Sequence, residues 1–348
     1  MALPLGALLN AEYAAPELIR LGRLCESLGY DQLWYTDVRL FRECYVGLAA
    51  LTAHTERIHL GPGVTDPYSR HPAVTAATIA TLDELSGHRA LLGLGVGGTG
   101  FRELGLSTPL PVAALREAVD MIRRLLRGEE VTSQGKVVSL SQGRLQFAPA
   151  RADIPIYIAT HGAQITKLAG EIADGALIAN AVLPPTIAFY LDQLREGAAK
   201  GGRTLRDVDV SLRFEVCVDD DEEAAIGVMR RRVAQRLIWG YPRLEFLERL
   251  DVVLPGTFLE LAARKDVGQL DRAAALVPIE AVERTVLAGH PDRVAKQVAA
   301  ALTPEITRIT IRPHALPGRS VAGVLRAFAE AVMPRAVAGQ PSNPRPTT

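Results

Sequence analysis

LLGLGVGGTG, residues 91–100, is the stretch that decides between two α/β folds. Its glycines have the spacing G-x-G-x-x-G after a short apolar run, which is the dinucleotide-binding fingerprint of Rossmann domains. That fingerprint needs a helix that opens on the glycines and an acid about 20 residues later, at a strand end. Here a loop with Gly and Pro follows, and Glu117 and Asp120 lie inside a helix predicted to begin near Pro111. The pattern therefore favours a glycine-rich strand end of another fold.

On both sides of this stretch, short apolar runs alternate with amphipathic helical stretches. Alternation predicts a parallel sheet, and eight strand–helix units in one unbroken series favour a closed (β/α)8 TIM barrel. An open doubly wound sheet is the alternative. Strands are expected at the opening segment and at residues 32–37, 57–63, 89–95, 154–160, 175–180, 209–218 and 306–312.

Helices are expected between these strands, with a helical insertion after strand 7. They span residues 16–28, 45–54, 72–86, 111–127, 162–172, 186–199, 291–302 and 320–332, with the insertion at about 220–290 and a loop-and-ribbon stretch at 128–147. We expect one domain over residues 1–336. The Pro- and Ser-rich segment 337–348 is predicted to be a disordered tail.

The composition excludes several classes of function. The 348 residues carry 39 Lys plus Arg and 39 Asp plus Glu, which removes the electrostatic argument for nucleic acid or an anionic membrane. No apolar run reaches the length of about 18 residues that a membrane span needs. The opening segment lacks the basic region of a signal peptide, and three cysteines without metal-ligand spacing suit a reducing compartment. We expect a cytoplasmic protein with no metal.

Active sites of (β/α)8 barrels lie at the carboxyl ends of the strands. Asp37 ends strand 2, where its carboxylate could accept a hydrogen bond from a ligand or from backbone N–H groups. The segment 61–67 has two glycines and two prolines around Val64-Thr65, an unusual path that indicates a tight turn or a functional shelf. His71 follows at the start of helix 3, and could cap it or face the site.

Later strand ends carry further candidates. Residues 160–164 open helix 5, whose free N–H groups form a ready anion site. Strand 7 alternates apolar and polar side chains, so Arg213 and Glu215 are expected to point into the barrel as an ion pair or toward a ligand. Arg312 ends strand 8 as a cation. The segment 83–89 enters strand 4 from the opposite face and is interpreted as structural.

The run LGPGVTDPYSRHPAVTAATIATLDELSGHRALLGLGVG, residues 60–97, resembles the bacterial luciferase-like oxidoreductases. Within them it is most similar to the branch of coenzyme F-420-dependent methylenetetrahydromethanopterin reductases. LCESLGYDQLWYTD before the run, IPIYIATHG at strand 5 and GHPDRVAKQV before strand 8 support the likeness. The resemblance covers most of the chain and weakens over about 220–280.

The resemblance implies a barrel, usually dimeric, that holds a flavin or deazaflavin ring over the carboxyl ends of its strands. It implies a cis peptide at Gly63–Val64 behind the ring, with Thr65 beside it, and a ring-facing acid at Asp37. The loop at the cofactor corresponds to Gly97, Gly98 and Thr99. The turn that contacts phosphate corresponds to Thr160, His161, Gly162, Ala163 and Gln164.

Two positions depart from the pattern of that family. Val38 stands where a His or another polar residue often follows the strand-2 acid, and Gly98-Thr99 stand where an acid often follows the glycines. The resemblance therefore does not identify the residue that donates the proton. Glu103 is near enough in sequence to substitute for the missing acid.

The sequence thus predicts an oxidoreductase that transfers a hydride between coenzyme F-420 and a small organic substrate, working as a homodimer. Asp37, His71, Glu103 and His161, in that order, are the acid/base candidates, and Val38, Arg213, Glu215 and Arg312 are expected on the substrate side. An FMN-dependent luciferase-like monooxygenase is the first alternative. A non-catalytic flavin- or deazaflavin-binding homologue is the second.

Overall fold

A computed structural model describes residues 3–98, 100–160, 162–242, 244–265 and 267–338. The chain forms two compact units. The N-terminal unit comprises Pro4–Ala179 and Tyr190–Ser211, and the C-terminal unit comprises Asn180–Phe189 and the chain from Leu212 onward, with the first three residues. One domain over residues 1–336 stays a prediction.

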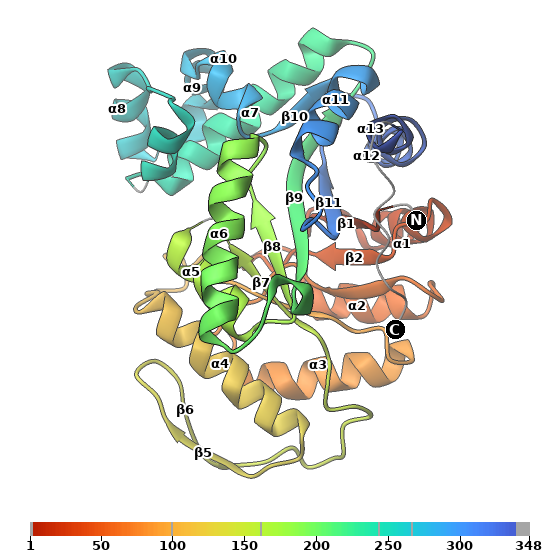
Figure 1. The fold of residues 1–348 in the computed structure, drawn as a ribbon, viewed down its shortest axis with the longest axis vertical. Coiled ribbons are helices and arrows are strands. Elements are labelled where there is room, and N and C mark those ends of the chain that lie inside the picture. The colour runs from red at the N-terminus through yellow and green to blue at the C-terminus, as the bar shows by residue number, and fades with distance from the viewer. Residues whose placement is uncertain (1–2, 99, 161, 243, 266, 339–348) are drawn as a thin grey trace. The chain divides into compact units, whose positions relative to one another are not determined.

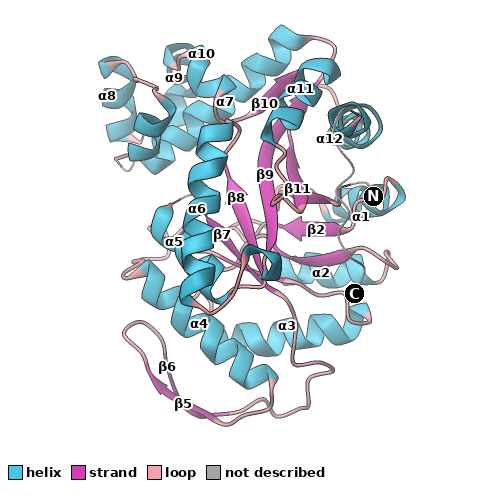
Figure 2. Ribbon diagram, viewed as in Figure 1, coloured by secondary structure: helices cyan, strands magenta, loops and turns pink. Residues whose placement is uncertain are grey.

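Parallel strands form the centre of the N-terminal unit (Figures 1 and 2). They are β1 (Leu5–Leu9), β2 (Gln32–Tyr35), β3 (His59–Pro62), β4 (Leu92–Leu94), β7 (Ile156–Thr160) and β8 (Gly175–Ala179). β1 pairs with β2, β2 with β3, β4 with β7 and β7 with β8. Single parallel bridges, Leu60 to Ala90 and Thr65 to Leu94, join the β3 and β4 segments. Four of these six strands are buried along their whole length; Ala159 of β7 is partly buried and only His59 of β3 is exposed, as expected for a sheet covered on both faces.

The helices of this unit begin and end where local residues require it. They are α1 (Ala15–Ser27), α2 (Cys44–Thr52), α3 (Pro72–Ser86), α4 (Pro111–Leu126) and α5 (Ala163–Ile172). A proline in the first turn starts α1, α3 and α4, where its missing N–H costs nothing. Gly87 ends α3 with φ of 65°, a left-handed conformation that favours glycine. The predicted bounds of α3 are those observed.

A hairpin stands apart from the parallel strands. Its strands, β5 (Val131–Gln134) and β6 (Ser139–Gly143), pair antiparallel and follow α4 (Figure 2). The carboxylate of Glu117 on α4 accepts from the backbone N–H groups of residues 136–138 at 2.8 to 3.0 Å and so holds the hairpin tip. The ribbon predicted at 128–147 is confirmed.

A small core lies among the strands of the N-terminal unit. Its buried members are Leu8, Trp34, Leu91, Tyr157 and Leu177. Trp34 and Tyr157 pack edge to face, with ring centroids 5.1 Å apart. The Tyr157 hydroxyl accepts from Gln32 at 2.9 Å and donates to Asp209 at 2.7 Å, so the polar end of this buried ring is satisfied.

The C-terminal unit contains β9 (Asp209–Val218) from Leu212 onward, β10 (Leu287–Gly289) and β11 (Arg308–Pro313). The predicted bounds of the seventh strand match β9. β10 pairs in parallel with β9, and β11 lies on the other side of β9. The sequence analysis missed β10 because three apolar residues in a helix-rich stretch carry no measurable strand period.

Helices make up the rest of this unit. They are α7 (Glu222–Gly240), η2 (Glu245–Leu250), α8 (Gly256–Arg264), η3 (Val267–Gln269), α9 (Leu270–Leu276), α10 (Ile279–Glu283), α11 (Pro291–Ala301), α12 (Val321–Ala327), the π-helical η4 (Phe328–Val332) and α13 (Met333–Val337). α6 (Pro184–Lys200) and η1 (Leu205–Asp207) precede β9 along the chain. The helical character predicted for about 220–290 is confirmed at α7–α10, and its standing as an insertion stays a prediction. Val337 of the predicted tail ends α13, and residues 339–348 lie outside the described residues.

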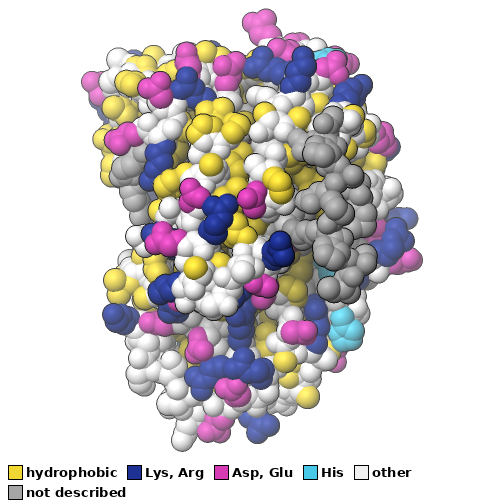
Figure 3. Space-filling view, in the orientation of Figure 1, with side chains coloured by type: hydrophobic (Ala, Val, Ile, Leu, Met, Phe, Trp, Pro, Cys, Tyr) yellow, Lys and Arg dark blue, Asp and Glu magenta, His cyan; other side chains and the backbone are white. Residues whose placement is uncertain are grey.

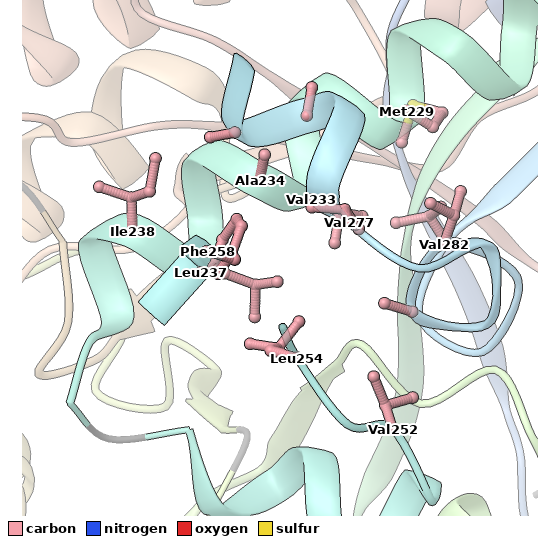
Figure 4. Close-up of a cluster of buried hydrophobic side chains, with 14 of the residues drawn as sticks. Met229, Val233, Ala234, Leu237, Ile238, Val252, Leu254, Phe258, Val277 and Val282 are labelled. Carbon is pink, nitrogen blue, oxygen red and sulfur yellow. The ribbon is translucent and has the colours of Figure 1, made fainter. Parts of the chain in front are cut away.

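A second core holds the helices α7–α10 together. Figure 4 shows the α7 side chains Val233, Leu237 and Ile238 beside Phe258 of α8, with Val252, Leu254, Val277 and Val282 around them. Phe258 is fully buried. α7 buries an apolar face against three short helices. The stability of these helices therefore comes from this packing as well as from helix propensity.

One face of the molecule carries no dominant sign of charge. Figure 3 shows acidic and basic side chains interspersed over one face. In the described part of the chain, no helix combines the length and apolar character needed to cross a membrane. The same described residues contain no cluster of three or more His, Cys, Asp or Glu arranged to hold a metal ion.

Candidate active site

Asp37 lies two residues beyond β2, half-buried in the wall of a hollow of about 450 Å³. Residues 37–43 and 69–71 line this hollow together with Val74 and Leu104. Burial raises the pKa of Asp37, while the Thr65 hydroxyl and the charges of Arg70 and Arg39 oppose the rise. A carboxyl with a raised pKa at a strand end is suited to hold or pass on a proton.

Polar atoms without partners lie next to this carboxyl. Thr65 is fully buried, and its Oγ1 makes no hydrogen bond of good geometry to the residues that the structure describes, although it is close enough to affect the pKa of Asp37. The hydroxyl of Tyr45, which interacts electrostatically with Asp37 and Thr65, is also buried and has no hydrogen-bond partner among the described residues. Buried hydroxyls are nearly always bonded, so each of these two has hydrogen-bonding capacity that the described residues do not use.

The segment after β3 forms a shelf beside these groups. Its Gly63–Val64 peptide is cis, as the resemblance implies. Gly63 N–H donates to the Tyr35 carbonyl at 2.7 Å, and Thr65 exchanges backbone bonds with residues 93 and 95 at 3.0 and 2.9 Å. A Cβ at Gly95 would lie 2.5 Å from a methyl of Val64, and one at Gly93 would collide with the Pro62 carbonyl. The glycines of the opening stretch thus make room for the shelf.

Arg39 and Asp66 connect the loops around the hollow. Arg39 Nη1 bonds Asp66 Oδ2 at 2.6 Å, and both side chains are buried. Asp66 also accepts from the backbone N–H groups of Tyr68 and Ser69 at 2.8 and 2.7 Å. The Arg39 guanidinium stacks on Phe101, 3.9 Å from the ring centroid. The sequence analysis missed these residues, and only the Asp-Pro turn signal at Asp66 could have indicated one of them.

Gly98 is the position where the resembled family often has an acid. Its φ is 127°, a conformation that side chains rarely adopt, and a Cβ there would collide with Arg39 Nη2. Gly97 has open space where a Cβ would be. The Arg39 guanidinium therefore occupies the room that an acid at position 98 would need. Thr99 lies outside the described residues.

The other acid/base candidates are engaged or exposed. His71 caps α3, with Nδ1 accepting from Ala73 N–H at 3.2 Å and Nε2 donating to the Ser139 carbonyl at 2.9 Å. Glu103 is exposed and pairs with Arg102 at 3.1 Å; a backbone hydrogen bond and Arg102 lower its pKa. Both sets of contacts oppose proton transfer by these residues in this state. His161 lies outside the described residues.

The start of α5 has backbone donors but no side-chain cap. Gly162 is its N-cap, and Ala163 and Gln164 are the first helical residues. Thr160 Oγ1 instead contacts Thr166 Oγ1 at 2.6 Å and the Gly162 carbonyl at 3.2 Å. The first N–H groups of α5 are thus not capped by a described side chain, and the phosphate turn stays a prediction.

The substrate-side candidates lie in both units. Val38 lines the hollow of the N-terminal unit. Arg213 and Glu215 form the predicted ion pair in the C-terminal unit, with Nη1 2.7 Å from Oε1, and Arg312 Nη1 lies 3.4 Å from the same oxygen. Glu215 is almost fully buried. The structure thus joins three of the four candidates.

The segment 83–89 is structural, as interpreted. Asp83 is buried, and Arg151 donates to it through Nε and Nη2 at 2.8 to 3.1 Å. Asp83 also accepts from Ala90 N–H at 3.2 Å and interacts with His88 at 3.3 Å. The carboxylate therefore fixes the start of the β4 segment to α3.

Comparison with known proteins decides the family. A family model described as luciferase-like monooxygenase matches residues 4–306. The chain belongs to this family. It is 35% identical to the 5,10-methylenetetrahydromethanopterin reductase of Methanolobus tindarius over 253 residues, 72% of this chain and 74% of that one. It is 30% identical to the F-420-dependent glucose-6-phosphate dehydrogenase of Beutenbergia cavernae, with 96% of this chain and 97% of that one covered.

A solved structure shows the fold of the whole chain. The coenzyme F-420-dependent tetrahydromethanopterin reductase of Methanopyrus kandleri superimposes with a TM-score of 0.85 at 29% identity, covering 96% of this chain and 99% of that one. This luciferase-like chain is therefore a (β/α)8 TIM barrel, as predicted, and the open doubly wound alternative is wrong.

Proposed function

We propose that this chain transfers a hydride between coenzyme F-420 and a small organic substrate. It is an oxidoreductase of the luciferase-like class, and the relatives named above are F-420-dependent reductases and dehydrogenases. The observation that carries the proposal is the group formed by Asp37, the Gly63–Val64 shelf and the unpartnered Thr65 hydroxyl.

The residues present fit a deazaflavin. Its ring carries carbonyl and N–H groups, which the buried hydroxyls of Thr65 and Tyr45 could bond. Its phosphate would suit the N–H groups at the start of α5, near Gly162–Gln164. Gly97 presents bare backbone to the approaching ligand. When bound, the deazaflavin would supply hydride chemistry at its C5.

The residues of the chain would orient both reactants and manage one proton. The shelf would set the depth of the ring, and Thr65 would orient its polar edge. Asp37 has the raised pKa that a proton donor or acceptor needs, whereas Glu103 has a lowered one and His71 is committed to capping α3. We infer that Asp37 carries the proton step and that Val38 makes the adjoining substrate wall apolar.

Titration of the purified full chain with F-420 and, separately, with FMN tests the cofactor. We expect quenching of F-420 fluorescence at micromolar or lower concentration. Submicromolar FMN binding without F-420 binding would contradict the proposal and favour the FMN-dependent monooxygenase. Tight F-420 binding with no turnover of any donor or acceptor would favour the non-catalytic homologue, for which Val38 and Gly98 give reason.

We also propose that the protein is a cytoplasmic homodimer. The three cysteines are free and buried, which suits a reducing compartment. Val46 on α2 and Val74 and Leu85 on α3 are exposed by 71%, 52% and 59%, beside a mainly apolar hollow of about 310 Å³ between these helices. An apolar surface of this kind is typical of an association site.

A further inference from the structure

Several cations of the C-terminal unit surround one buried carboxylate. Glu215 of β9 has a side chain that is 3% exposed. Its contacts are Arg213 Nη1 at 2.7 Å, Arg232 Nε at 3.3 Å, Arg312 Nη1 at 3.4 Å and His314 Nε2 at 2.6 Å. We call these five residues, with Arg236 added below, the Glu215 cluster. The partners come from β9, α7, β11 and the residue after β11, so the fold assembles them from distant parts of the unit.

Two arginines of the Glu215 cluster share its one carboxylate. Burial opposes ionisation of Glu215, but the charges of Arg312, Arg232 and Arg213 outweigh it and hold its pKa well below the usual range. Burial lowers the pKa of His314, so its neutral ring donates Nε2–H to the carboxylate. In the described part of the chain, Arg213 and Arg232 ion-pair with no carboxylate other than Glu215. One negative charge thus serves both of these guanidinium groups.

Arg236 of α7 adds a fourth guanidinium with unmet hydrogen bonds. Its Nη1 donates to Asn180 Oδ1 at 2.6 Å, while its Nε and Nη2 are buried and have no partner among the described residues. Burial lowers its pKa to about 10, so it stays protonated at neutral pH, and it interacts electrostatically with Glu215, Arg213 and Arg232. A buried charged donor without an acceptor is costly unless a ligand supplies the acceptor.

The cluster is open to a ligand from solvent. The side chains of Arg213, Arg232 and Arg312 keep 14%, 18% and 17% exposure, whereas Glu215 at their centre is closed off. Guanidinium groups present forked donors whose geometry matches the two oxygens of a carboxylate or phosphate. One arginine would be enough to form an ion pair with Glu215. The Nε and Nη2 donors of Arg236, beside Arg213 and Arg232, are available to a second oxyanion.

We propose that the Glu215 cluster is an oxyanion-binding site that takes a carboxylate or phosphate group of the substrate. Glu215 holds the guanidinium groups in place, and its own charge limits how tightly the ligand binds. That the oxyanion belongs to the substrate rests on the proposed function. Anion binding by the cluster does not depend on it.

Inorganic phosphate is the first probe, titrated into the full chain without cofactor and compared with chloride at equal ionic strength. Binding is measured by calorimetry and by the shift in Tm. Arg232→Gln should weaken phosphate binding at least tenfold. Arg231→Gln is the matched control, because Arg231 is the preceding residue of α7, is exposed and pairs with Asp271 at 2.7 Å. It should bind phosphate as the unaltered protein does.

Glu215→Gln separates an anion site from a purely structural cluster. Removal of the competing carboxylate should strengthen phosphate binding at least tenfold, with phosphate restoring any Tm that the substitution costs. A destabilised Glu215→Gln protein that phosphate does not rescue would overturn the proposal. So would the absence of a phosphate effect beyond that of chloride, or an equal loss in Arg231→Gln. Succinate in place of phosphate distinguishes the two oxyanions, since the tighter binder identifies the group.

The test of the oxyanion site does not depend on which cofactor the protein binds. A protein that binds phosphate at the cluster but neither F-420 nor FMN would refute the proposed function and still support the oxyanion site. A protein that binds F-420 but shows no cluster-dependent anion binding would refute the oxyanion site alone.

Discussion

The half-buried carboxyl group of Asp37 reduces the stability of the fold and is proposed to serve catalysis. Its pKa is raised by burial, so the ionised form costs the folded state free energy. That cost is present above the folded-state pKa and disappears below the unfolded value of about 3.9. A side chain that weakens the fold in this way is typical of functional sites.

Asp37→Asn should therefore stabilise the protein and inactivate it. We expect a higher Tm at pH 7, an advantage that shrinks as the pH falls toward 4, and at least a hundredfold lower kcat with F-420. Thermal unfolding between pH 4 and 8 and steady-state kinetics measure the two effects. A variant with unchanged Tm and full activity would show that Asp37 neither bears a buried charge nor moves the proton.

Gly98→Ala is expected to be harmful although it adds one methyl group. The φ of 127° and the collision of a Cβ with Arg39 Nη2 should cost about 1 kcal/mol or more of unfolding free energy. Gly97→Ala is the matched control, because no described atom lies within 4 Å of a Cβ there. Urea unfolding of both variants measures the difference. Equal stability of the two would contradict the close contact with Arg39.

At the scale of elements, Asp83 joins α3 to the β4 segment through Arg151. Burial alone would raise the pKa of Asp83, but hydrogen bonds from Arg151 and His88 lower it. A lowered folded-state pKa means that the ionised carboxylate adds stability above the unfolded value of about 3.9. That contribution is lost as the pH falls through the folded-state pKa.

Asp83→Asn should cost about 3 kcal/mol of unfolding free energy at pH 7, because Arg151 loses its buried partner. The difference from the unaltered protein should diminish in strongly acidic solution. Glu84→Gln, at the exposed neighbour on α3, should change stability by less than about 0.5 kcal/mol. Denaturant unfolding at pH 7 and pH 2 tests both, and equal effects of the two substitutions at pH 7 would refute the role of Asp83.

Whether an element could be predicted from the sequence depended on local signals. α3 has a starting Pro72 and an ending Gly87, and β9 alternates apolar and polar residues over ten positions, so both were located to the residue. β10 has three residues and no alternation. The same holds for the site residues. Asp37 can be predicted because it follows a strand, whereas Arg39 and Arg232 cannot, because their partners are distant in sequence and come close only in the folded chain.

At the scale of the whole molecule, the apolar surface of α2 and α3 should mediate self-association. Light scattering after size-exclusion chromatography should give a mass twice the 37.4 kDa of the chain. Leu85→Glu should shift this mass toward that of one chain, because a charge at the interface is left unpaired. Val253→Glu, at a residue that is 84% exposed in the C-terminal unit, should leave it unchanged. A mass of one chain for the unaltered protein would exclude the homodimer.

The position of Arg39 restricts the order in which mutations can change this site. Its guanidinium is bonded to Asp66 and stacked on Phe101, so it cannot swing away when a side chain is added at Gly98. A laboratory evolution experiment that selects for an acid at position 98 should recover it only after Arg39 has been shortened. The two changes would then be beneficial in one order and harmful in the other, and the present loop would persist even where an acid there would speed catalysis.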